Sequence, residues 1–78
     1  MQITDKQVVQ LASVAALMGR FAGCLADFEV ETIAEIGRRY LGGRQDTVVT
    51  AREWSVVELA LEDMERAQAR ALAGTRAA

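Results

Sequence analysis

The 78-residue sequence predicts an all-α fold, a small three-helix bundle of long, short and long helices. Two observations predict it. Capping signatures of the form Thr-x-x-Gln/Glu occur at residues 4–7 and 50–53, and apolar residues follow each at helical spacing. The length permits a single domain, which buries about 60% of the surface that its unfolded chain exposes. We therefore expect dimerisation or a partner to complete the bundle.

The first helix is expected over residues 5–25. Thr4 caps it, because the hydroxyl can accept from the backbone N–H of Gln7 while the Gln7 side chain reaches back to Thr4. Ile3 and Val8 stand at the two positions of a hydrophobic staple. The larger apolar residues of the segment recur at helical spacing: Val8, Leu11, Leu17, Met18, Phe21 and Leu25.

Small residues also recur along this helix at spacings of three and four, and Gly19 and Gly23 form a GxxxG motif. Such residues let two helix backbones approach closely. The simpler interpretation is that the stripe seats another helix of the same chain, and the alternative is a seam between two chains. A break of the helix between Gly19 and Gly23 is a third possibility. The candidate seam residues are Ala12, Ala16, Gly19 and Gly23.

The second helix is expected over residues 27–41, with Asp27 as its N-cap and Gly42 as a left-handed C-cap. A start at Thr32, three residues before a glutamate, is the less favoured alternative. The expected apolar face consists of Phe28, Ile33, Ile36 and Tyr40, with Ala34 and Gly37 alongside.

The third helix is expected over residues 51–73, and residues 74–78 are expected to be a frayed tail. Thr50 and Glu53 form its capping box, and Val49 and Trp54 its staple. Its apolar stripe is Trp54, Val57, Leu61 and Met64, and the stripe thins beyond Met64. The preceding loop holds a strand-forming pair, Val48-Val49, with no second strand to pair with.

The expected lengths leave apolar surface uncovered. The outer helices would each be roughly 30 Å long and the middle one roughly 20 Å. A short middle helix cannot cover two long ones, so part of their apolar stripes would face solvent. This favours a homodimer, or an apolar groove for a partner, along the flanks of the first and third helices.

Residues suited to catalysis are scarce. The chain has no histidine, so the commonest general base and metal ligand is missing. The single cysteine, Cys24, is expected to be a small buried apolar residue. No phosphate-binding loop, calcium loop or zinc-ligand spacing occurs in the sequence. We therefore expect no enzyme activity, no cofactor and no metal.

Two charged sets are candidate partner-binding residues. Glu58, Glu62 and Glu65 would form an acidic stripe on the third helix, which is either a solvated face or a contact surface for a basic partner. A basic set with one tyrosine lies at the end of the second helix, where it either compensates the helix dipole or forms an interface hot spot. Its members are Arg38, Arg39, Tyr40 and Arg44.

These observations favour a non-catalytic, cytoplasmic regulator that binds another protein, acting as a stoichiometric inhibitor, antiactivator or adaptor, and they favour a homodimer. The single free thiol favours a reducing compartment, and no apolar run is long enough to span a membrane. A bacterial phage or mobile-element protein, such as an anti-CRISPR-type inhibitor, fits the size by elimination. The alternative is a small helical DNA-binding transcription regulator, although the net charge of −2 counts against direct contact with nucleic acid.

Overall fold

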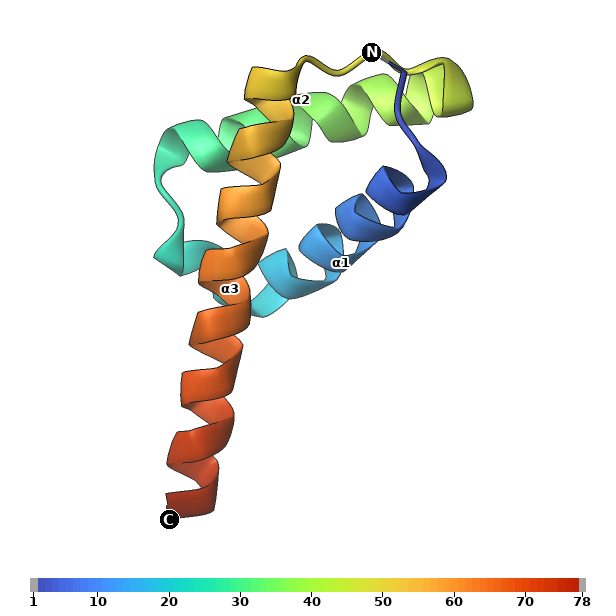
Figure 1. The fold of residues 1–78 in the computed structure, drawn as a ribbon. Helices are drawn as coiled ribbons and strands as arrows, with labels where there is room; N and C mark the ends of the chain where they lie inside the picture. Colours follow the sequence, from blue (N-terminus) through green and yellow to red (C-terminus); the bar gives the residue numbers. More distant parts are fainter. Residues whose placement is uncertain (1, 78) are drawn as a thin grey trace.

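The structure, a computed structural model, describes residues 2–77 and the side chains of residues 2–74. It confirms the all-α fold with three helices (Figure 1). Helix α1 spans Asp5–Phe21, α2 spans Asp27–Gly43 and α3 spans Ala51–Ala77. Short 3₁₀ turns follow the first two helices, η1 at Ala22–Cys24 and η2 at Arg44–Asp46.

Both capping boxes are confirmed. At α1, the Thr4 hydroxyl accepts from the Gln7 backbone N–H at 3.1 Å, and the Gln7 side chain accepts from the Thr4 N–H at 2.9 Å. At α3, the corresponding distances between Thr50 and Glu53 are 3.1 Å and 3.0 Å. Both helices therefore begin where the sequence predicts, because a local side-chain bond satisfies the otherwise unpaired N–H groups of the first turn.

The core forms around α3. Figure 1 shows α3 crossing both other helices, which diverge from each other, and α1 and α2 each pack on α3 far more than on one another. The predicted stripe of α3 is buried except at Leu61, which is partly exposed. The buried apolar residues are Trp54, Val57, Ala60 and Met64 of α3, Leu11 and Val14 of α1, Ile33 and Ile36 of α2, and the flanking Ile3 and Val49.

Helix α1 is shorter than predicted and ends at Phe21 rather than Leu25. The chain then forms η1, which contains Gly23. The alternative of a helix break between Gly19 and Gly23 is therefore the one that the structure shows. Glycine lowers helix stability by about 1 kcal/mol relative to alanine, which favours an early end here. As a result α1 and α2 are equally long, at 17 residues each, and the middle helix is not the short one.

The N-terminus of α2 differs from the prediction by one residue. Ala26 is the N-cap, and Asp27 is the first helical residue. Alanine has no capping side chain, and the carboxylate of Glu29 instead accepts from the Ala26 backbone N–H at 2.9 Å. Glu29 is itself buried, and its second oxygen has no hydrogen-bond partner. The alternative start at Thr32 is not used, since the Thr32 hydroxyl donates to the Phe28 carbonyl inside the helix.

The C-terminus of α2 is also displaced. The helix continues through Gly42 and ends at Gly43, so Gly42 is not a left-handed C-cap. The positive φ falls on the next residue, Arg44, at φ 50° and ψ −124°. A residue with a Cβ is strained in this region, where glycine is the usual occupant.

The segment between α2 and α3 does find a pairing partner, contrary to the prediction for Val48. Gln2 forms a single antiparallel β-bridge with Val48, and the Ile3 N–H donates to the Thr47 carbonyl at 2.9 Å. The Thr47 hydroxyl, which is buried, donates to the Arg39 carbonyl at 3.2 Å. These bonds hold the start of α1 beside the end of α2.

Helix α3 extends past the core. The helix continues through Gly74 to Ala77, where the sequence indicated a frayed tail, and Ala78 lies outside the described residues. From residue 65 to 74 no side chain is buried. In Figure 1 this half of α3 projects beyond the other helices. Within the described residues, no helix combines the length and apolar character needed to cross a bilayer.

Candidate functional site

An open apolar groove lies between α1 and α2. It follows from the packing, because both helices rest on α3 and diverge from each other instead of closing the bundle. Its volume is about 490 Å³. The wall from α1 consists of Val8, Leu11, Ala12 and Ala15, and the wall from α2 consists of Ala34, Gly37, Arg38, Tyr40 and Leu41. The sequence predicted a groove, but on the flanks of the first and third helices rather than here.

Residue size explains why the groove stays open. At one end the facing residues are Ala15 and Ala34, whose methyl groups cannot reach across the gap between two helices. At the other end, larger side chains line it, and one of them, Leu41, is 69% exposed. Arg38 is the one charged side chain in the lining. A concave surface that is almost wholly apolar, with a single cation, is suited to bind an apolar segment rather than a polar metabolite.

The small-residue stripe of α1 does not seat another helix of the chain. Ala12, Ala16, Gly19 and Gly23 are all exposed, and a Cβ added at either glycine would meet nothing within 4 Å. The simpler interpretation of the stripe is therefore wrong. Because α1 ends at Phe21, Gly23 belongs to η1, so the GxxxG motif does not form one face of an α-helix. Ala12 lines the groove, and a seam between chains stays a prediction.

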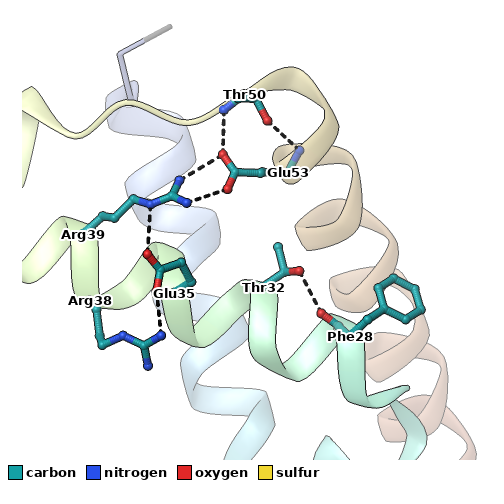
Figure 2. Close-up of polar contacts among 7 residues, drawn as sticks. All are labelled: Phe28, Thr32, Glu35, Arg38, Arg39, Thr50 and Glu53. Atoms are coloured by element: carbon teal, nitrogen blue, oxygen red, sulfur yellow. Dashed lines mark hydrogen bonds and ion pairs between the residues drawn. The ribbon is translucent and has the colours of Figure 1, made fainter.

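Arg39 ties α2 to α3 (Figure 2). Its guanidinium donates to one Glu53 oxygen at 2.9 Å and pairs with the other at 2.8 Å, and it contacts Glu35 at 3.3 Å. The same Glu53 carboxylate accepts from the Thr50 N–H, so the cap of α3 and the link to α2 share one group. The hydrogen bond from Arg39, followed by the backbone bond from Thr50, lowers the pKa of Glu53 from 4.5 to about 2. Conversely, the hydrogen bond to Glu53 raises the pKa of Arg39.

The other basic candidates lie along the groove. Because α2 continues to Gly43, neither Arg38 nor Arg39 is in its last turn, so dipole compensation remains an interpretation only for Arg44, the C-cap residue. Arg38 lines the groove and pairs with Glu35 at 2.6 Å, which lowers the pKa of that carboxyl. Tyr40 is partly buried in the groove wall, and the Arg44 guanidinium carbon lies 5.7 Å from its ring centroid. The structure thus places Arg38 and Tyr40 in one wall of the groove, and Arg44 against the Tyr40 ring outside the lining.

The acidic candidates lie elsewhere, on the exposed side of α3. Glu58, Glu62 and Glu65 are all exposed, and Glu62 pairs with Arg66 at 3.0 Å. Within one chain these carboxylates form no ion pair with Arg38 or Arg44, so the acidic and basic sets are separate surfaces.

Two further expectations are corrected. Cys24 is exposed rather than buried, because it lies in η1 and not on a packed helix face. Phe28 is 58% exposed rather than part of the apolar face of α2. It lies about 140° around the helix from Ile33, which faces α3, so the two cannot share one stripe. Among the described residues, no group of three Cys, Asp or Glu side chains could hold a metal ion.

Sequence reasoning missed the groove lining because its small residues were assigned to buried contacts. The available signal was the pairing of small residues on two helices, Ala12 and Ala15 with Ala34 and Gly37, which leaves space rather than filling it. Comparison of the chain with protein-family models, curated proteins and solved structures finds no match.

Proposed function

We propose that the chain is a non-catalytic, protein-binding regulator, a stoichiometric inhibitor, antiactivator or adaptor, and that the groove between α1 and α2 receives an amphipathic helix of another polypeptide. The groove is the observation that supports this proposal. It is apolar over nearly its whole lining, and its two walls each span about two helical turns, from Val8 to Ala15 and from Ala34 to Leu41.

The dimensions favour a helix as the bound segment. An amphipathic helix presents apolar side chains at every third or fourth residue, and two turns of groove accommodate two or three of them. The groove lining has exposed Leu41 together with Arg38 and Tyr40, which resembles the usual composition of an interface: an apolar centre with arginine and tyrosine.

Site-specific photo-cross-linking tests the proposal. A benzoylphenylalanine at Leu41 is expected to form a cross-link with a bound protein at one copy per chain. The same group at Val9, which is equally exposed but lies outside the groove lining, serves as the matched control. The substitution Ala34→Glu, which adds a charge to the groove, should abolish the Leu41 cross-link.

Equal cross-linking from Leu41 and Val9, or a Leu41 cross-link that survives Ala34→Glu, would contradict the proposal. If the Leu41 cross-link identifies a partner, the activity of that purified protein should fall or change when an equimolar amount of the chain is added. DNA binding that weakens steeply with salt would instead support the alternative of a small helical transcription regulator.

A further inference from the structure

The second half of α3 is a helical arm that extends beyond α1 and α2 (Figure 1). Residues 65–74 are helical, none of them is buried, and Leu72 in this stretch is 58% exposed. Helices of about 12 residues are marginal in water unless tertiary packing stabilises one face. The arm is therefore a helix with an uncovered face, on a molecule that also has an unfilled groove.

One face of α3 carries a continuous exposed stripe. Its residues follow one another at spacings of four, three, four and three, which places them on the same side of the helix. They are Glu58, Glu62, Glu65, Ala69 and Leu72, all exposed. The stripe is acidic where α3 lies against the core and apolar where the arm projects.

The groove has the complementary order. Toward the C-terminus of α2 the lining carries the cation Arg38, which pairs with Glu35 at 2.6 Å and is otherwise exposed. The other end of the groove, between Ala15 and Ala34, is apolar and has room for a larger side chain. Glu65 and Leu72 are seven residues apart, about 10 Å along α3, and Arg38 is four residues, about 6 Å, from Ala34 along α2. The long side chains of Arg38 and Glu65 span the difference.

We propose that a second copy of this chain occupies the groove, with Leu72 of its arm between Ala15 and Ala34 and its Glu65 at Arg38. The inference rests on the proposed function, since it names an occupant of the same groove. Charge complementarity selects this occupant: the stripe presents carboxylates at the basic end of the groove and a leucine at the apolar end. A protein partner of the groove would bind by displacing the arm.

The experiment measures the mass of the full chain by analytical ultracentrifugation. The wild type is expected at twice 8.5 kDa. Ala34→Glu, which blocks the groove, and Leu72→Glu, which charges the arm, should each weaken association by roughly tenfold or more. Ala16→Glu is the matched control, because Ala16 is equally exposed on α1 but lies outside the groove lining, and it should leave the mass unchanged.

Mixing the two variants identifies the contact. A chain with a blocked groove still has an intact arm, and a chain with a charged arm still has an intact groove. The mixture of Ala34→Glu and Leu72→Glu should therefore form a heterodimer that neither variant forms alone, measured by native mass spectrometry. Circular dichroism of each variant confirms that it is folded.

A monomeric wild type, a mixture that does not associate, or dissociation by the Ala16→Glu control would each overturn the inference. None of these outcomes bears on the cross-link from Leu41 to a different protein, so the proposed function can fail or stand separately.

Discussion

The ion pair between Arg39 and Glu53 predicts how the free energy of unfolding depends on pH. The substitution Glu53→Gln removes the ion pair but keeps the cap of α3, because the first capping box of this chain already uses a glutamine, Gln7, at the equivalent position. The change therefore separates the tie between α2 and α3 from the start of the helix.

The magnitude follows from the pKa. The hydrogen bond from Arg39, with the backbone bond from Thr50, lowers the pKa of Glu53 from 4.5 to about 2. Without screening by solvent, a pKa shift of this size would add about 3 kcal/mol to the free energy of unfolding at neutral pH. The two side chains remain 25% and 36% exposed, so solvent screens the pair. We expect Glu53→Gln to lower the free energy of unfolding at neutral pH by about 1–2 kcal/mol.

The sign is fixed by the direction of the shift. A carboxyl whose pKa is depressed in the folded state contributes its full stability above the unfolded value of 4.5 and loses it as the pH falls toward about 2. Urea unfolding followed by circular dichroism, at neutral pH and at steps down to the acid range, measures the difference between wild type and Glu53→Gln. The two curves should converge at low pH.

A difference that stays constant from neutral pH to acid would refute this reasoning. Glu62→Gln is the matched control, since Glu62 pairs with Arg66 on the open surface of the same helix. Its effect should not exceed a few tenths of a kcal/mol at any pH.

Two further substitutions test the backbone. Arg44→Gly should be more stable than Arg44→Ala by about 1–2 kcal/mol, because only glycine relieves the positive φ while both variants lose the contact with Tyr40; equal urea midpoints would show that Arg44 is unstrained. Gly19→Ala should raise the free energy of unfolding by about 0.5–1 kcal/mol without changing the mass in solution, because its Cβ meets open space on a helix. A loss of association in Gly19→Ala would instead place a seam between chains at this residue.

The helices were largely predictable because their signals are local. A threonine and the residue three positions later decide where α1 and α3 begin, and a repeat of three and four decides which face of α3 is buried. The ends of α1 and α2 were less predictable. Gly19 and Gly42 both lie within helices, since glycine lowers helix stability by only about 1 kcal/mol and does not by itself end a helix.

The candidate site was predictable in kind but not in place. The order of residues indicated uncovered apolar surface, and it singled out Arg38 and Tyr40, which the structure places in one wall of the groove. The same reasoning could not show that Arg39, between them, is engaged with Glu53 of another helix. Ion pairs over a separation of 14 residues depend on how helices cross, which no local pattern encodes.

The sequence by itself determined that this protein has three helices, where two of them start and which residues of α3 face the core. The tertiary structure alone decided that α1 and α2 both rest on α3 and leave a groove between them. The physical reason is that caps and periodicity act over one or two turns. Whether alanines at 12, 15 and 34 are buried by a neighbour or left as the wall of a groove depends on the crossing of whole helices.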